Sequence, residues 1–227
     1  MQIVEMVLGL LPGFAWLFFY LEEDRHPEPK KLIAKTFIFG IGFAFIALWV
    51  EILLISALKS AGIGKLAIFS LFVFALIEEF VKFAAAYLSI HKNPAFDEPT
   101  DAMIYMVTAA LGFATVENLG AIGSISLSAN HTAILSNVFA NISLRFVGAT
   151  LLHSLTSAIL GYCWAMGIRN FGKKWYIVLG LAAATILHTL FNYLIINLGN
   201  VIYALVFLVI IAFFVLNDFE KLKRRAL

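Results

Sequence analysis

Long apolar stretches separated by short polar breaks dominate the pattern of hydrophobic and polar positions along this chain. A helix needs about 20 apolar residues to cross a bilayer, and seven stretches come close to or exceed that length. They cover residues 3–21, 36–57, 66–90, 101–121, 145–167, 175–197 and 199–217. The pattern therefore predicts an all-α fold, a polytopic transmembrane helical bundle of about seven spans, with residues 1–227 forming a single membrane domain.

One segment between these stretches departs from the pattern. Residues 122–144 are rich in serine and asparagine and mixed in polarity, so we expect a loop together with an interfacial or re-entrant helix. The break at 197–200 is short, which predicts a tight hairpin between the last two spans. The composition agrees with a membrane protein, because 62% of the residues are hydrophobic and only 13% are charged.

The basic residues predict the orientation of the bundle. Of the 16 lysines and arginines, twelve lie at one set of helix ends and only Lys59 and Lys65 lie at the other. Basic residues collect on the cytoplasmic side of membrane proteins, so we expect the N-terminus outside and the C-terminus inside. The net charge of +2 gives no indication of nucleic-acid binding, and the expected surroundings are the lipid bilayer.

Three ionisable residues lie in the middle of the apolar stretch 66–90: Glu78, Glu79 and Lys82. A charged side chain at that depth costs about 2.5–3.5 kcal/mol on insertion scales, so each needs a reason to be there. The lysine can pair with either glutamate, one helical turn away. A structural ion cluster would explain one pair, but the second carboxylate remains in surplus and is a candidate general base or acid.

The next stretch, 101–121, carries further polar groups. Phe113 and Glu117 lie four residues apart on one helix face, and Asn118 is beside them. A glutamate near a helix end is often only an interfacial residue. Asp101 directly follows Pro99 and Thr100, where it is well placed as the acid at a helix N-terminus.

Two later spans each add a polar pair. Arg145 and His153 share one stripe of the fifth span; the arginine can simply snorkel to the outer interface, whereas the histidine lies at mid-helix. His188 and Asn192 lie four apart on the sixth span, either as hydrogen-bonding contacts between helices or as donors to an oxyanion.

Depth suggests that these groups form one site. Helices running in alternating directions all place them at the middle of the bilayer or in its outer half. A water-filled cavity open to the outside requires such an arrangement, since ionisable groups inside membranes normally face cavities of that kind. Carboxylates, histidines and an amide can support hydrolysis. Glu117, His153 and His188 also match a zinc site of two histidines and one glutamate in ligand type, although no HExxH zinc helix is present.

The order of four short motifs resembles the PrsW family of intramembrane proteases, which is related to the CAAX-protease and bacteriocin-processing group. The motifs are IEEFVK at 77–82, DAMIYMVTAALGFATVENL at 101–119, R-x₇-H at 145–153 and H-x₃-N at 188–192. The resemblance implies an endopeptidase of a prokaryotic cell membrane with its catalytic core in residues 66–197. It implies cleavage of a single-span, anti-sigma-factor-like membrane protein near the extracytoplasmic side.

The resemblance also assigns the site. The implied catalytic residues are Glu78, Glu79, Glu117, His153, His188 and Asn192, supported by Lys82, Phe113, Asn118, Asp101 and Arg145. We expect a glutamate-activated water and no cofactor, with zinc as the alternative. The chain has Glu117 where the CAAX group tends to show histidine, and Lys82 in place of an arginine one residue further on, which argues against prenyl-protein substrates. A proton-coupled transporter using the Glu/His cluster as a relay is the main rival, and a non-catalytic membrane scaffold is a third interpretation.

Overall fold

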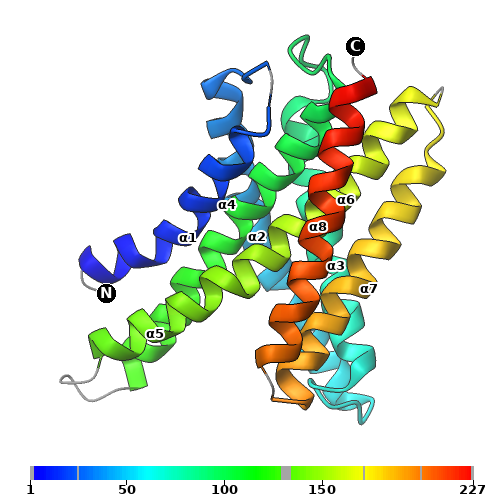
Figure 1. Ribbon diagram of the computed structural model, residues 1–227. Coiled ribbons are helices and arrows are strands. Elements are labelled where there is room, and N and C mark those ends of the chain that lie inside the picture. Colours follow the sequence, from blue (N-terminus) through cyan, green and yellow to red (C-terminus); the bar gives the residue numbers. More distant parts are fainter. Residues whose placement is uncertain (1–2, 25, 129–133, 171, 200, 226–227) are drawn as a thin grey trace.

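The computed structural model describes residues 3–24, 26–128, 134–170, 172–199 and 201–225, and its secondary structure there is entirely α-helical (Figure 1). The predicted fold class, a polytopic helical membrane bundle, is therefore confirmed. The helices are α1 (Ile3–Leu21), α2 (Lys30–Ser60), α3 (Ile68–Ile90), α4 (Pro99–Ser128), α5 (Ile134–Val147), α6 (Ala149–Arg169), α7 (Trp175–Asn197) and α8 (Val201–Arg225).

Six stretches are long and apolar enough to cross a membrane: α1, α2, α4 up to Ile125, the segment Ser136–Arg169, α7 and α8 up to Arg224. The one expected span that is missing from these six, 66–90, corresponds to α3, which has 23 residues. It falls outside this set by composition, because Glu78, Glu79 and Lys82 lie near its middle. All three side chains are buried inside the bundle, which removes them from contact with lipid.

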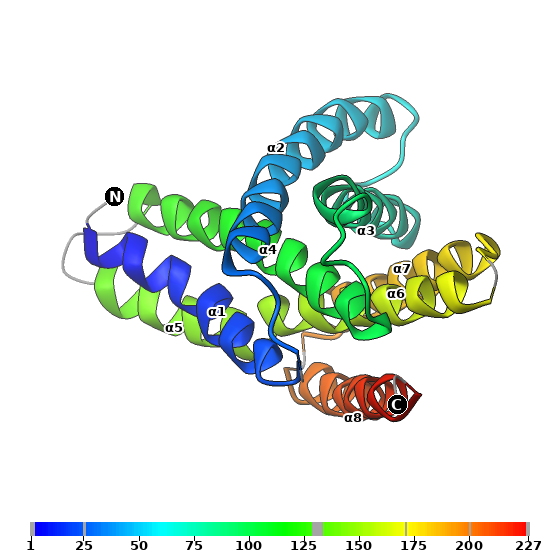
Figure 2. The same cartoon turned by 90° about the horizontal axis from the view of Figure 1, so that it is seen from above.

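Helix α4 forms the centre of the bundle and contacts α1, α2, α3, α5, α6 and α8 (Figure 2). Glycines let its neighbours approach very closely. A Cβ atom on Gly112 would lie 2.1 Å from the carbonyl oxygen of Phe37 in α2, and one on Gly40 would lie 2.1 Å from that of Ala109. Small residues at crossings are how membrane helices pack without a hydrophobic driving force between them.

Two boundaries differ from the sequence-based expectation. The span expected over 145–167 is broken at Gly148, whose backbone angles of φ −111° and ψ −97° are not helical, so Arg145 belongs to α5 and His153 to α6. The segment 122–144 is more helical than expected: α4 continues to Ser128 and α5 begins at Ile134. Residues 129–133, where we expected a loop, lie outside the described residues.

The segments predicted to carry most of the basic residues lie at one end of the bundle. The connections after α1, α3 and α6 and the C-terminal end of α8 all lie at the same end of the bundle (Figure 1). Asp101 also lies near this end and accepts hydrogen bonds from the backbone N–H groups of Asp97 and Glu98, at 2.9 and 2.8 Å. It serves the N-terminus of α4, as its position in the sequence predicts, and takes no part in the cluster described below.

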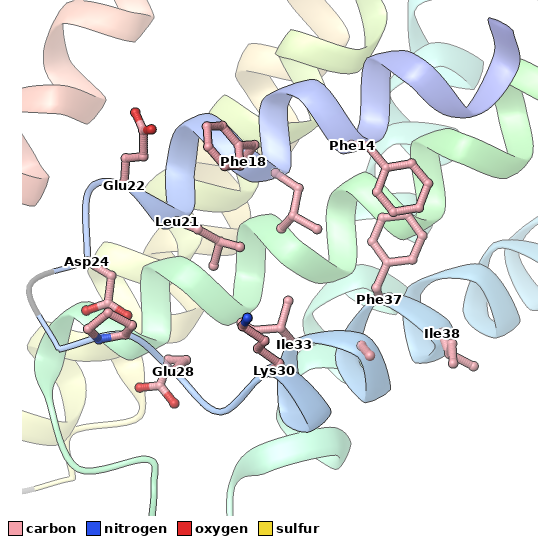
Figure 3. A pocket seen from close by; sticks show the side chains of 13 residues that line it. Phe14, Phe18, Leu21, Glu22, Asp24, Glu28, Lys30, Ile33, Phe37 and Ile38 are labelled. Atoms are coloured by element: carbon pink, nitrogen blue, oxygen red, sulfur yellow. The ribbon is translucent and has the colours of Figure 1, made fainter. Parts of the chain in front are cut away.

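A large pocket lies at the same end, between α1 and α2, and has a volume of about 660 Å³. Figure 3 shows Asp24 and Glu28 at one end of this pocket and Phe37 and Ile38 at the other. It contains none of the residues expected in a catalytic site.

Candidate active site

Helices α3, α6 and α7 bring five of the expected residues together in the interior. Glu79 and Lys82 are fully buried, and Glu78, His153 and His188 are only 3–8% exposed. The rings of the two histidines lie edge to face, with their centroids 5.0 Å apart. Residues from three separate helices thus form a compact polar cluster inside an apolar bundle.

Glu79 is the anchor of this cluster. Its Oε1 atom accepts hydrogen bonds from Lys82 Nζ at 2.6 Å and from Thr156 Oγ1 at 3.0 Å, and it lies 2.8 Å from His188 Nδ1. Three donors on one oxygen require an ionised carboxylate, which only accepts hydrogen bonds. The paired charge of Lys82 makes that ionised state tolerable in the interior.

Glu117 of α4 holds the second histidine. Its Oε2 atom lies 2.8 Å from His153 Nε2 and accepts a hydrogen bond from Arg145 Nη2 at 3.1 Å. Arg145 Nε also donates to Asn118 Oδ1 at 2.6 Å, and Asn118 Nδ2 donates to Thr150 Oγ1 at 3.1 Å. The side chain of Glu117 is 33% exposed, so this carboxylate is the accessible one of the cluster.

These contacts assign the tautomers of both histidines. A carboxylate cannot donate, so His153 carries its proton on Nε2, facing Glu117, and His188 carries its proton on Nδ1, facing Glu79. The lone pairs are then on His153 Nδ1 and His188 Nε2. Both face Glu78 Oε2, at 3.9 and 3.7 Å respectively.

The donor set fits a divalent metal ion. Glu78, His153 and His188 each offer one ligand atom, and the three atoms lie within 4.8 Å of one another. Ligand atoms around tetrahedral zinc are about 3.3–3.5 Å apart, so the separations of 3.9 and 3.7 Å between Glu78 Oε2 and the two histidine nitrogens would contract by a few tenths of an ångström on binding. Glu78 Oε2 is buried and has no hydrogen-bond partner among the described residues, as expected for an atom that a cation would satisfy. A histidine ligand usually donates its other N–H to a carboxylate, and both histidines do so here.

The composition of this group differs from the sequence-based expectation. We expected any metal to be held by Glu117, His153 and His188, but Glu78 is the carboxylate that faces both lone pairs. Glu117 lies behind His153 and holds its ring instead. The pattern of residues could not distinguish these roles, because every one of these side chains comes from a different helix.

The other expected residues surround the cluster at different distances. The Phe113 ring lies 5.7 Å from that of His153, and Lys82 Nζ lies 5.5 Å from the centre of the same phenylalanine ring. Lys82 Nζ also lies 3.1 Å from His153 Nδ1, so its ammonium group donates to the lone pair that a metal would take, and this contact would have to break for His153 to bind a metal. Asn192, one turn beyond His188, is half-buried and forms no hydrogen bond with the described residues.

One ionisable residue near the cluster was missed by sequence reasoning. Glu51 of α2 lies within electrostatic range of both Glu78 and Glu117. It is an ionisable residue inside an apolar stretch, the same signal that identified Glu78 and Glu79. The signal was therefore present in the sequence, in the span predicted over 36–57.

Comparison with known proteins assigns the chain to a family. Residues 28–216 match the model of the family described as PrsW family intramembrane metalloprotease. The chain belongs to the PrsW family. The matched segment contains every residue of the cluster, and no solved structure matches the chain.

Curated relatives support the same assignment. The chain is 28% identical over 190 residues to the protease PrsW of Geobacillus kaustophilus, covering 82% of this chain and 77% of the relative. It is 27% identical over 222 residues to the protease PrsW of Bacillus subtilis, covering 94% and 93% of the two chains. With that of Clostridioides difficile the identity is 32% over 120 residues, or 52% and 50% of the chains.

The family settles the class of protein. This PrsW-family chain is an integral membrane protease, as the four motifs indicated. The expected preference for a glutamate-activated water over a metal is not supported. The family is described as one of metalloproteases, and Glu78 lies with two histidines in a group that could hold a metal.

Proposed function

We propose that the protein is a metal-dependent intramembrane endopeptidase in which Glu78, His153 and His188 hold a divalent cation. The observation that carries this proposal is the convergence of two histidine lone pairs on the unpartnered Oε2 atom of Glu78. Zinc is the best match to two imidazoles and one carboxylate. When bound, such a cation supplies a Lewis acid that polarises a peptide carbonyl and makes water a stronger acid.

The remaining carboxylates have separate tasks in this mechanism. Glu79 fixes the tautomer and ring orientation of His188, and Lys82 balances its charge. Glu117 fixes His153 in the same way through Oε2. Its Oε1 atom makes no hydrogen bond with the described residues, and its side chain is the exposed one. We assign to this oxygen the proton transfer from water to the leaving amine.

Asn192 completes the proposed machinery. Its amide is one turn outward from His188 on α7, and no described residue uses its hydrogen-bonding capacity. An amide donor in that position could stabilise the oxyanion that develops on the peptide carbonyl. Removal of one such donor typically lowers kcat by about 10²–10³-fold.

The substrate we propose is a single-span, anti-sigma-factor-like membrane protein, cleaved near its extracytoplasmic side. Two distances support the extracytoplasmic side. Glu78 is ten residues from the start of α3 at Ile68, and His188 is nine residues from the end of α7 at Asn197, which place the cluster about 14–15 Å from that end of the bundle. The opposite end carries most of the basic residues and is the cytoplasmic end by the positive-inside rule.

The test is proteolysis in proteoliposomes that contain the full chain and a library of single-span membrane substrates. The wild type is compared with Glu78→Gln and with Glu22→Gln, which removes an exposed carboxylate far from the cluster. We expect cleavage by the wild type and by Glu22→Gln, loss of cleavage in Glu78→Gln, loss on chelation, and recovery with zinc. Cleavage by the wild type that resists a strong chelator would contradict the metal-dependent mechanism.

A further inference from the structure

A second cavity lies directly outward of the two histidines, between α5, α6, α7 and α8. Its volume is about 220 Å³, and we call it the α5–α8 pocket. Ala149 and Phe191 line it; Ala149 is four residues before His153 on α6, and Phe191 is three residues after His188 on α7. Residues three or four apart share a helix face, so the pocket occupies the turn next to both histidines.

The pocket is also connected to the cluster by hydrogen bonds. Arg145 lines it and donates from Nη2 to Glu117 Oε2, which in turn lies 2.8 Å from His153 Nε2. A group seated in the pocket would therefore lie beside the chain of contacts that positions a proposed metal ligand. The contacts of the cluster give the α5–α8 pocket no other role.

The lining of the pocket suits an apolar group that also donates one backbone hydrogen bond. Apart from Asn141 and Arg145, the lining is aliphatic, aromatic or glycine. The Oδ1 atom of Asn141 is buried and has no hydrogen-bond partner among the described residues. An unpaired buried acceptor costs about 1–3 kcal/mol, which the N–H of a peptide bound there would offset.

The rim of the pocket is accessible from the surroundings of the bundle. Leu144 is 56% exposed and Val201 is 41% exposed, and both line it. A volume of about 220 Å³ is below the roughly 300–1,000 Å³ of small-molecule sites, and suits a single large side chain better than a whole ligand.

We propose that the α5–α8 pocket is a specificity pocket that receives one bulky apolar side chain, of leucine or phenylalanine size, next to the scissile bond of the substrate. This assignment rests on the proposed proteolytic function of the cluster. The side chain enters from the lipid side past Leu144 and Val201, and Asn141 Oδ1 accepts the backbone N–H of the same substrate segment. Occupation of the pocket fixes which peptide bond lies against His153 and His188.

The test changes the size of the pocket and measures which side chains are accepted. The wild type, Ala149→Phe, which fills the pocket, and Leu205→Ala, which widens it, are reconstituted in proteoliposomes. Each cleaves a library of single-span substrates that carry alanine, valine, leucine or phenylalanine at positions around the cut. Val206→Phe is the matched control, because Val206 neighbours Leu205 but is 54% exposed and does not line the pocket.

We expect the wild type to select a bulky apolar residue at one fixed position beside the cut. Ala149→Phe should lower the ratio of kcat/KM for bulky over small side chains by about 10–200-fold, the range that hydrophobic pockets achieve. Leu205→Ala should shift the preference toward phenylalanine, and Val206→Phe should keep the wild-type ratio.

Two results would overturn the assignment while leaving the proposed proteolytic function standing. One is an unchanged cleavage profile in Ala149→Phe and Leu205→Ala. The other is a fall in kcat/KM that is equal for all four side chains, which would show that the pocket does not distinguish them. Absence of cleavage by the wild type would overturn the proposed function itself, and the pocket assignment with it.

Discussion

Removal of the carboxylate of Glu79 is the perturbation whose consequence the structure defines most sharply. Lys82 is fully buried, and its ammonium group has two partners, Glu79 Oε1 at 2.6 Å and His153 Nδ1 at 3.1 Å. Glu79→Gln leaves a buried cation without its counter-charge. Breaking a buried ion pair in this way costs about 3–5 kcal/mol, so we expect a strong loss of stability.

The magnitude can be measured by thermal unfolding of the full chain in detergent. For a chain of this size, 1 kcal/mol corresponds to a shift in Tm of about 2–4 °C, so Glu79→Gln should lower Tm by about 6–20 °C. The double variant Glu79→Gln/Lys82→Met should recover most of this loss, because both charges are then absent from the interior.

A matched control exists on α8. Asp218 and Lys221 have the same i,i+3 spacing as Glu79 and Lys82 and a similar separation of 2.7 Å, but the lysine side chain is 53% exposed. Exposed pairs contribute about 0–1 kcal/mol, so Asp218→Asn should shift Tm by no more than about 4 °C. Equal shifts in the two variants, or no recovery in the double variant, would refute the reasoning that the inner pair is stabilised by its burial.

Three further predictions follow from other parts of the molecule. Glu117→Ala removes the carboxylate behind His153 and should weaken zinc affinity about 10–100-fold in a chelator-competition titration; unchanged affinity would show that Glu117 does not support the ligand. Burial raises the pKa of Asp24, which lies outside the spans. Ionisation of this carboxyl in the folded protein therefore lowers the free energy of unfolding at pH values above the raised pKa. This penalty disappears as the pH falls to the ordinary pKa of an aspartate. Asp24→Asn should therefore raise Tm at pH 7 and lose this advantage in acid, whereas a pH-independent difference would exclude the carboxyl as its cause. Gly112→Ala puts a methyl group 2.1 Å from the backbone oxygen of Phe37 and should destabilise the protein by about 1–3 kcal/mol, whereas Gly42→Ala, which meets nothing within 4 Å, should not.

The sequence predicted the fold because bilayer length and apolar composition leave few alternatives to a helical bundle. It failed at Gly148, since a single non-helical residue does not interrupt the apolar pattern. The last apolar stretch ends at 217, but α8 continues to Arg225 through lysines, glutamate and arginines that favour helix.

The sequence identified which residues form the candidate site, but not what each of them does. Ionisable side chains in apolar stretches identified Glu78, Glu79, His153 and His188, because each is costly at that depth and needs a partner or a function. Glu78 and Glu79 point about 100° apart on α3, and only the packing of α6 and α7 decides which of them faces both histidines. Sequence pattern contains no information on the relative rotation of helices, so the metal-binding carboxylate was assigned to Glu117.

The measurement that tests the central claim most directly is the metal content of the purified full chain after equilibration with zinc and removal of the excess. The wild type should retain about one zinc ion per chain. His188→Ala and Glu78→Gln should each lose it, and Glu22→Gln should keep it. A zinc content in Glu78→Gln and His188→Ala equal to that of the wild type, or a wild type that binds no zinc and still cleaves its substrates, would contradict the assignment of Glu78, His153 and His188 as the metal site.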